Sequence, residues 1–391
     1  MTRLRPDFRQ SLLDCGFPPF RKLTEALETT APSVAIRLNP RKPGAAVPAG
    51  ARPVPWHPGA FLLPERPDFT LDPAMHQGAY YVQDPSSMFV AEILRQLLPE
   101  LPPRPRVLDL CAAPGGKTTA MADLLPDGSL MVSNAYDFRR AEILKENIIK
   151  WGYPWSVVTR GDTSRFRALP GFFDLAVVDA PCSGEGMMRK DPKACEQWSP
   201  ALVARCAALQ EEILDNAAAT LRPGGFLIYS TCTFNTDENE RQTARLLASG
   251  EFSRVEITLD PSWNILCEAP DNSPFPSLRF LPGRVEGEGY TVAVLRKTGD
   301  SPRTEPSSTP KKTPKGAKGA GNRQPKLPEA ELLSRVPASL RPRLAALREG
   351  EVAAIPETIH REFLHLSDCL DIVHAGITVA EAKGRDFRPT Q

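Results

Sequence analysis

The chain has 391 residues, 41% of them hydrophobic, which is enough for two or three domains with a buried core. Its 48 Lys and Arg residues nearly balance its 47 Asp and Glu residues, so the net charge is +1. No apolar run reaches the roughly eighteen residues of a membrane span, the first residues lack a signal-peptide core, and the cysteines form no CxxC pair. We therefore expect a cytoplasmic protein with reduced thiols and without a membrane segment or a metal site.

Basic residues are frequent near the N-terminus, in a region that we place at residues 1–100. They are Arg3, Arg5, Arg9, Arg21, Lys22, Arg37, Arg41 and Lys42. Tyr80, Tyr81 and Phe89 follow them. This composition is consistent with an accessory domain that binds nucleic acid, although ordinary solvated charge explains much of it.

Strand and helix patterns alternate in residues 101–297. Strands are predicted at 106–110, 130–133, 156–159, 175–179 and 226–230, and helices at 118–125 and 139–151. Another helix is predicted from the spacing of Leu202, Cys206, Leu209, Ile213, Ala217 and Leu221, with Pro223-Gly224-Gly225 ending it. The alternation predicts an α/β fold with a doubly wound, largely parallel sheet that binds ligands at the carboxyl ends of its strands.

A glycine-containing loop follows the first of these strands and reads Cys111-Ala112-Ala113-Pro114-Gly115-Gly116-Lys117. The two glycines let a ligand approach the backbone closely. The loop is not a Walker A motif, because Cys111 stands where the first glycine is required, and it is not GxGxxG. A nucleoside-type cofactor therefore fits better than a triphosphate, and a simple tight turn is the alternative.

Two predicted strands each end in a polar segment that carries a cysteine. The first reads Asp179-Ala180-Pro181-Cys182-Ser183-Gly184-Glu185-Gly186, and the second reads Tyr229-Ser230-Thr231-Cys232-Thr233-Phe234. Neighbouring parallel strands would bring both thiols to one edge of the sheet. Two thiols beside Asp179 suit covalent attack on a pyrimidine ring, whereas a lone cysteine is more often a small buried apolar residue.

Residues 298–326 are rich in Pro, Gly, Ser and Lys and lack apolar periodicity. They are predicted to form a disordered basic linker, either a solvated tether or a weak contact for nucleic-acid phosphates. Residues 327–391 then form a separate C-terminal region.

The motifs LDLCAAPGGKT, DAPCSGEG and YSTCTF together resemble those of the Sun-type RNA cytosine-C5 methyltransferases, especially the bacterial RsmF-like branch. The resemblance covers roughly residues 30 to 297 and includes Gly78–Met88 upstream. It implies a Rossmann-like class I methyltransferase domain, an N-terminal α+β RNA-binding domain and S-adenosylmethionine as methyl donor. It also implies that the substrate is 16S ribosomal RNA or the small ribosomal subunit. Residues 352–391 resemble part of a PUA-like RNA-binding module, and we expect a monomer.

The same resemblance implies roles for individual residues. Cys232 is the nucleophile that adds to C6 of cytosine, Cys182 assists product release, and Asp179 hydrogen-bonds the base and contacts the cofactor. The backbone of Cys111, Ala112, Ala113, Pro114, Gly115, Gly116 and Lys117 holds the methionine part of the donor. Asp162 faces the adenine, with an Asx turn as the alternative. Ala135 stands where relatives have a ribose-binding acid, so that either Asp137 replaces it or the contact is lost.

Other functions remain as alternatives. The motifs do not distinguish ribosomal from transfer RNA, so a tRNA cytosine-C5 methyltransferase is the second hypothesis. A DNA methyltransferase would use the Pro181-Cys182 cysteine and a Glu-Asn-Val motif, which this sequence lacks. A non-catalytic RNA-binding protein would have no need for both cysteines.

Overall fold

The computed structural model describes residues 4–16, 20–42, 45–267, 276–299, 337–347, 350–383 and 386–389. The predicted linker lies outside these residues, apart from Thr298 and Gly299. The helices are α1 (Pro6–Asp14), α2 (Phe20–Thr29), α3 (Pro73–His76), α4 (Phe89–Leu97), α5 (Gly116–Ala122), α6 (Phe138–Trp151), α7 (Pro192–Gln197), α8 (Pro200–Thr220), α9 (Glu240–Ala248) and α11 (His360–Cys369). The strands are β1 (Ala35–Leu38), β2 (Arg52–Val54), β3 (His57–Leu62), β4 (Tyr80–Val82), β5 (Arg106–Asp109), β6 (Leu130–Ala135), β7 (Ser156–Arg160), β8 (Phe173–Asp179), β9 (Leu221–Thr231), β10 (Phe252–Arg254), β11 (Leu278–Phe280), β12 (Tyr290–Lys297), β13 (Leu344–Ala346), β14 (Glu351–Ala354), β15 (Ile372–Ala375), β16 (Ile377–Lys383) and β17 (Asp386–Pro389).

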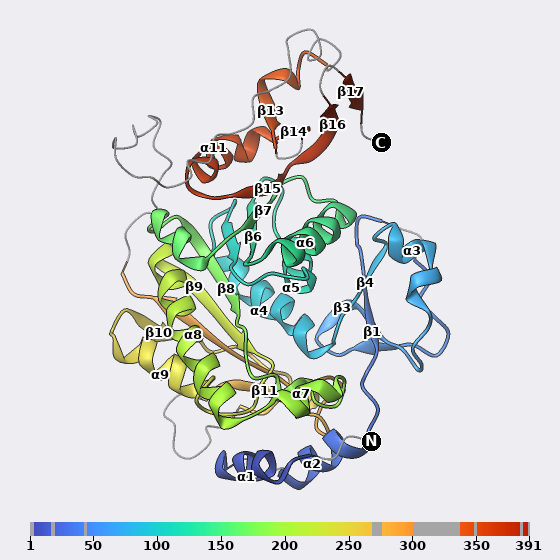
Figure 1. Cartoon of the computed structure of the whole chain (residues 1–391), viewed down its shortest axis with the longest axis vertical. Coiled ribbons are helices and arrows are strands. Elements are labelled where there is room, and N and C mark those ends of the chain that lie inside the picture. The colour runs from blue at the N-terminus through green and yellow to red at the C-terminus, as the bar shows by residue number, and fades with distance from the viewer. Residues whose placement is uncertain are drawn as a thin grey trace.

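A large sheet occupies the middle of the molecule (Figure 1). Its strands lie in the order β10-β12-β9-β8-β5-β6-β7-β15, and β11 pairs with β12. The neighbours from β7 to β9 are parallel, whereas β12 runs antiparallel to β9. The predicted α/β class with a doubly wound, largely parallel sheet is therefore confirmed.

Both faces of this sheet are covered, which explains why apolar residues occupy consecutive positions in its strands. Val157 and Val158 are adjacent in β7, so their side chains point to opposite faces, yet both are fully buried. Val158 packs with Leu144 and Ile148 of α6, and Val157 belongs to the main core, which includes Ile213 of α8. Apolar side chains at consecutive positions are what such a doubly covered sheet requires.

The end of α8 differs from the sequence prediction. The helix ends at Thr220, and Leu221 already pairs with Phe173 of β8. The Pro223-Gly224-Gly225 segment, predicted to stop the helix, lies inside β9 as an irregularity in the pairing register. Leu209, predicted on the apolar face of this helix, is exposed.

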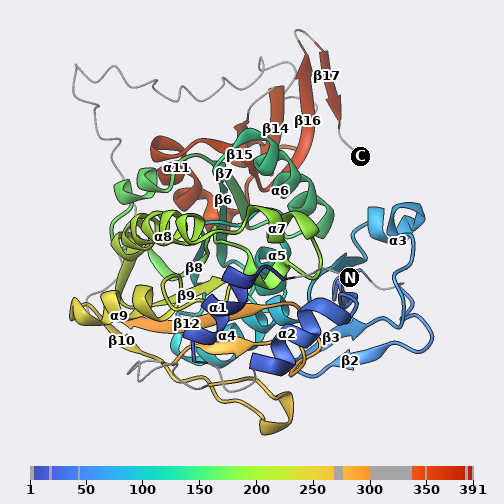
Figure 2. The same ribbon diagram turned by 60° about the horizontal axis from the view of Figure 1, so that its bottom comes forward.

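The N-terminal strands form a small antiparallel sheet in the order β2-β3-β1-β4, beside the central sheet. Figure 2 brings α1 and α2 to the front, and Phe8 of α1 meets Trp198 edge to face with ring centroids 5.1 Å apart. Helix α4 lies in the main core, where Phe89 and Ile93 are fully buried. The N-terminal region is thus packed tightly against the central domain.

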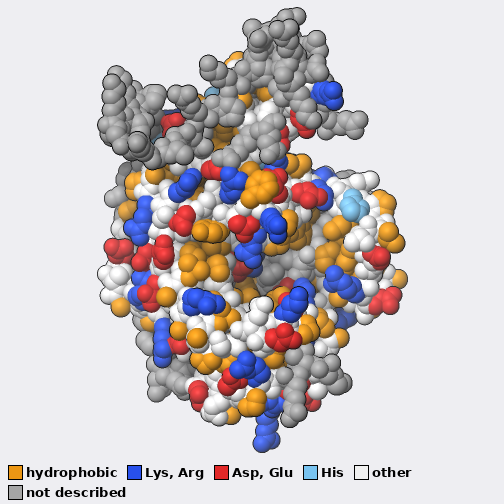
Figure 3. Space-filling model, viewed as in Figure 1, with side chains coloured by type: hydrophobic (Ala, Val, Ile, Leu, Met, Phe, Trp, Pro, Cys, Tyr) orange, Lys and Arg blue, Asp and Glu red, His pale blue; other side chains and the backbone are white. Residues whose placement is uncertain are grey.

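Arg37, one of the basic residues counted toward a nucleic-acid-binding region, is buried instead of exposed. Its side chain is fully buried, pairs with Asp123, and donates to Gln83 at 3.1 Å and to Thr119 at 2.6 Å. It therefore fastens β1 to α5. Other members of the set are ion-paired at the surface, such as Arg41 with Asp127 at 2.7 Å. On the face shown in Figure 3, basic and acidic side chains are interspersed.

The C-terminal elements lie at one edge of the central sheet (Figure 1). Strands β13-β14-β16-β17 form their own antiparallel sheet, whereas β15 pairs antiparallel with β7. Arg160 binds Asp371 at 2.9 Å, and Arg106 binds Glu362 at 2.9 Å. The described C-terminal residues are thus joined to the central sheet by strand pairing as well as by ion pairs. No helix in the described part of the chain is long and apolar enough to cross a membrane.

Candidate active site

A pocket of about 180 Å³ lies at the carboxyl ends of β5 and β8. It is lined by Tyr81, Val82, Gln83, Asp84, Ser87, Asp109, Cys111, Ala112, Ala113, Pro114, Gly116, Lys117 and Asp179. The structure therefore brings most of the predicted cofactor loop together with Asp179. Residues of the Gly78–Met88 segment form another wall of the pocket. The sequence did not predict that this segment contributes to the site.

The glycine loop owes its shape to backbone that only glycine adopts easily. Gly115 precedes α5 with a φ of 112°, in the left-handed region. The neighbouring carbonyl of Pro114 accepts from Asn147 Nδ2 at 2.8 Å, which ties the loop to α6. A Cβ atom at Gly116 would lie 3.3 Å from both Tyr81 and Gln83, so that this position must be small to leave the pocket open.

Charged groups are concentrated at the floor of the pocket. Lys117 Nζ lies 2.7 Å from one carboxylate oxygen of Asp179, and Ser230 Oγ donates to the other at 2.8 Å. Burial raises the pKa of Asp109 to about 7, although Thr118 Oγ1 donates to it at 2.6 Å. The described residues contain no cluster of three or more His, Cys, Asp or Glu side chains suited to a metal ion.

Cys182 and Cys232 meet at the adjacent ends of β8 and β9. Their sulfur atoms are 3.1 Å apart, and the backbone N–H of Cys232 points to Cys182 Sγ at 3.4 Å. Both side chains are half-buried thiols. The hydrogen bond to Cys232, burial and the charge of that neighbour raise the pKa of Cys182. Two thiols this close do not both ionise readily, so the pair favours a single thiolate.

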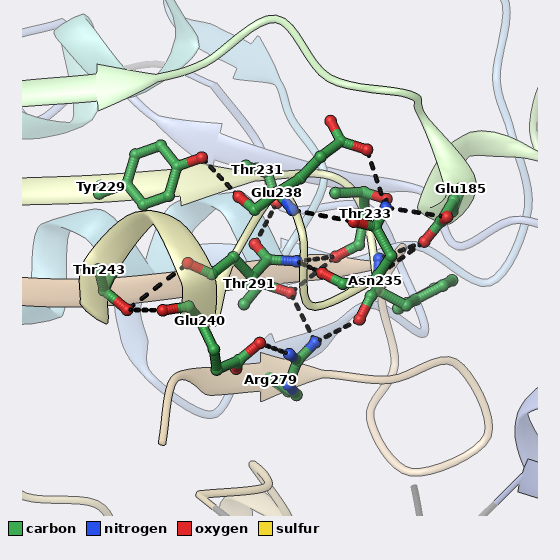
Figure 4. Close-up of polar contacts among 12 residues, drawn as sticks. Glu185, Tyr229, Thr231, Thr233, Asn235, Glu238, Glu240, Thr243, Arg279 and Thr291 are labelled. Carbon is green, nitrogen blue, oxygen red and sulfur yellow. Dashed lines mark hydrogen bonds and ion pairs between the residues drawn. The ribbon is translucent and has the colours of Figure 1, made fainter. Parts of the chain in front are cut away.

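The two cysteine segments are bound to each other directly. Gly186 N–H donates to the carbonyl of Cys232 at 2.9 Å, and the hydroxyls of Ser183 and Thr233 are 3.0 Å apart. Behind them lies a buried polar network that includes Glu185, Asn235 and Glu238 (Figure 4). The sequence interpretation missed these three residues, and their positions inside or just after the cysteine motifs were the available signal.

Asp162 lies outside the pocket lining. Its exposed carboxylate accepts from the backbone N–H of Ser164 at 2.9 Å and from the hydroxyl of that residue at 2.6 Å. This is the Asx-type turn that stood as the alternative to adenine contact. Contact with an adenine therefore remains a proposal without support from the pocket geometry.

The structure also shows the surroundings of Ala135, which stands where relatives have an acidic residue that binds the ribose. Ala135 is buried at the end of β6, and Asp137 is the N-cap of α6, accepting from the N–H of Arg140 at 3.0 Å. A carboxylate engaged in capping is held at the helix terminus. The structure thus gives Asp137 a capping role and does not place it in the pocket lining.

Asp137→Ala is accordingly expected to destabilise the protein by about 1 kcal/mol, the usual value of an N-cap, while changing S-adenosylmethionine affinity little. Thermal unfolding and titration calorimetry on the same preparation separate these effects. Asp137→Ser keeps a capping oxygen and should retain most of the stability. A large loss of affinity with both substitutions would instead assign Asp137 to the ribose.

Comparisons with known proteins agree with this architecture. Residues 97–296 match the family described as 16S rRNA methyltransferase RsmB/F, and residues 7–85 match the N-terminal domain of 16S rRNA methyltransferase RsmF. Ribosomal RNA small subunit methyltransferase F of Cronobacter sakazakii is 38% identical over 252 residues, which cover 63% of this chain and 51% of that protein. The enzyme of the same name from Enterobacter is 39% identical over 254 residues, with the same coverage. The chain thus spans about half the length of the curated relatives that it matches.

Solved structures show the same fold. A methyltransferase homologue from Pyrococcus horikoshii aligns with a TM-score of 0.60 at 24% identity, over 75% of this chain and 100% of that chain. NSun6 from Pyrococcus horikoshii, solved with SFG, aligns with a TM-score of 0.61 at 19% identity, over 76% and 99%. Because the RsmB/F match extends over more than half of the sequence and contains both cysteine segments, this chain belongs to the 16S rRNA methyltransferase RsmB/F family.

Proposed function

We propose that this protein methylates carbon 5 of a cytosine in 16S ribosomal RNA, using S-adenosylmethionine and a covalent cysteine adduct. The observation that carries the proposal is the pair of half-buried thiols, 3.1 Å apart, at the strand ends beside the Asp179 pocket. Family membership and the names of the relatives support the RNA class. The cytosine-C5 chemistry rests on the two cysteines.

The pocket suits the methionine part of S-adenosylmethionine for two reasons. The absence of a side chain at Gly116 lets a ligand approach the backbone, and Lys117 and Asp179 provide charged groups in the pocket lining. The backbone from Cys111 to Lys117 would hold that part of the molecule. When bound, S-adenosylmethionine supplies an electrophilic methyl group.

The reaction requires a nucleophilic C5, which an aromatic cytosine lacks. The thiolate of Cys232 forms a bond to C6, and the ring electrons then make C5 an enamine-like carbon that takes the methyl group. A base removes the C5 proton, the C6–S bond breaks, and the thiolate of Cys232 is regenerated. Cys182 acts at this release step. Asp179 hydrogen-bonds the base, and the target cytosine must be turned out of its stack to reach the thiols.

The substrate is tested by methylation of matched RNAs. Activity should be higher on small-subunit rRNA, naked or in the subunit, than on transfer RNA. Binding should weaken steeply with added salt, because phosphate contacts release counterions. Bisulfite sequencing of RNA from cells with and without the protein locates the modified cytosine. Preferential methylation of transfer RNA under the same conditions would favour the second hypothesis.

A further inference from the structure

Two buried glutamates cross-link the cysteine segments in opposite directions (Figure 4). Glu185 follows Cys182 in sequence, but its Oε2 accepts from the backbone N–H groups of Phe234 at 2.7 Å and Asn235 at 2.9 Å, just beyond Cys232. Glu238 follows Cys232, but its Oε2 accepts from the N–H of Ser183 at 3.0 Å, next to Cys182. Each carboxylate thus holds the segment of the other cysteine.

Asn235 lies between the two carboxylates. Its Nδ2 donates to Glu185 at 3.0 Å and to Glu238 at 2.8 Å, and its Oδ1 accepts from the N–H of Glu238 at 2.9 Å. Buried groups with this many matched partners are fixed in one arrangement, and an unmatched replacement is costly. The network therefore determines where the two segments lie relative to each other.

The two glutamates nevertheless differ, because Glu238 has an additional contact near Cys182. Glu238 Oε2 also accepts from Gln210 Nε2 at 2.8 Å, and the same Nε2 donates to the carbonyl of Pro181 at 2.9 Å. Glu238 therefore holds the chain on both sides of Cys182. Burial raises the pKa of Glu238, whereas its hydrogen bonds from Ser183 and Asn235 favour the carboxylate.

We propose that Glu238 is a positioning residue that gives the two cysteines their different roles. The proposal deepens the proposed function and rests on it for the identity of the nucleophile. With Ser183 and Gln210 fixed, Cys182 stays against Cys232. The negative charge of Glu238 then acts mainly on Cys182, so that the single thiolate of the pair forms at Cys232, which attacks, while Cys182 keeps its proton until the release step.

The electrostatic surroundings agree with this assignment. The pKa of Cys182 is raised by its hydrogen bond to Cys232, by burial, by the charge of Cys232 and by Glu238. Besides Glu185 and Asp179, two further ionisable groups near the pair are Tyr229 of β9 and Cys206 of α8. Burial raises the pKa of Tyr229 and that of Cys206, the latter to about 11, so both stay neutral near pH 7.

Thiol alkylation tests the proposal without RNA or methyl donor, so a wrong substrate assignment would leave it intact. The full chain is treated with iodoacetamide across a pH series, and each cysteine is quantified by peptide mass spectrometry. In the wild type, Cys232 should react at lower pH than Cys182. In Glu238→Gln, the Cys182 profile should move to lower pH, and each unit of movement raises its thiolate fraction about tenfold at a given pH.

Three variants separate charge from packing. Glu238→Asp keeps the charge but shortens the side chain, and should preserve the order of reactivity. Asp237→Asn removes a neighbouring charge from an ion pair with Arg241 at the surface, and should leave both profiles in place. Glu185→Gln alters the other carboxylate of the network and should not shift Cys182 to lower pH.

The proposal is overturned if a folded Glu238→Gln protein keeps the wild-type Cys182 profile, or if Glu238→Asp shifts it equally. If circular dichroism shows that Glu238→Gln is not folded, the alkylation profiles of the wild type and of Glu238→Asp test the proposal. Reaction of Cys182 at lower pH than Cys232 in either protein would reject the assignment.

Discussion

Cys232→Ala is expected to abolish methylation and to form no covalent complex with RNA, whereas Cys182→Ala is expected to accumulate one. The first substitution removes the sulfur that bonds to C6, so activity should fall by several orders of magnitude, as when a catalytic nucleophile is deleted. The second leaves that sulfur in place but hinders elimination. The measurement is denaturing electrophoresis of each variant incubated with small-subunit rRNA and S-adenosylmethionine, alongside a methylation assay.

The two substitutions can be compared directly because they perturb the structure in a similar way. Both side chains are half-buried, and each substitution removes one sulfur from the same contact of 3.1 Å. The backbone bridge from Gly186 to the carbonyl of Cys232 is untouched by either change. Cys206→Ala serves as a control, because this thiol lies buried on α8 and outside the proposed chemistry. An adduct with Cys232→Ala but none with Cys182→Ala would reverse the two roles. Methylation by Cys182→Ala without a trapped adduct would show that release does not need Cys182.

The parts of the fold that the sequence predicted correctly depend on local pattern. The runs at β5, β6, β7 and β8 are apolar because the sheet is covered on both faces, and a buried parallel strand has that signature on its own. The predicted meeting of the two cysteines at one sheet edge followed from strand direction alone, and the structure places them in contact.

The parts that could not be predicted depend on distant partners. Leu221 has helical spacing, but it lies in β9 because Phe173 of β8 pairs with it. Arg37 lies among basic residues that are typical of a protein surface, but it is buried and pairs with Asp123, which is 86 residues away in the sequence. Glu238 lies just after the second cysteine motif, but its partners Ser183 and Gln210 belong to other segments, so its position in the sequence does not show which residues it holds.

Strand β15 is the clearest example of a distant partner. Residues 371–375 read as part of a separate C-terminal module, yet Ile372 pairs with Thr159 and Ala375 with Val157 at the edge of the methyltransferase sheet. An edge strand accepts any suitable segment, and sequence spacing does not show which one arrives.

Gly115→Val is expected to weaken S-adenosylmethionine binding at least about tenfold, which corresponds to about 1.4 kcal/mol. The reason differs from simple filling of the pocket. Gly115 has a φ of 112°, and a Cβ atom there would lie 3.1 Å from Leu144 of α6, on the side of the helix rather than among the residues that line the pocket. A side chain would add backbone strain of about 1–3 kcal/mol and push the Cys111–Pro114 segment away from α6. Titration calorimetry measures the affinity.

Gly250→Val is the matched control for strain. Gly250 also has a left-handed backbone, with a φ of 75°, but a Cβ atom there meets nothing within 4 Å. It should therefore lower the unfolding temperature without weakening S-adenosylmethionine binding. If both substitutions reduce affinity equally, the loss reflects general destabilisation. If Gly115→Val binds normally, the loop does not hold the methyl donor. Loss confined to Gly115→Val would mean that the backbone path from Cys111 to Lys117, rather than any one side chain, forms the binding surface.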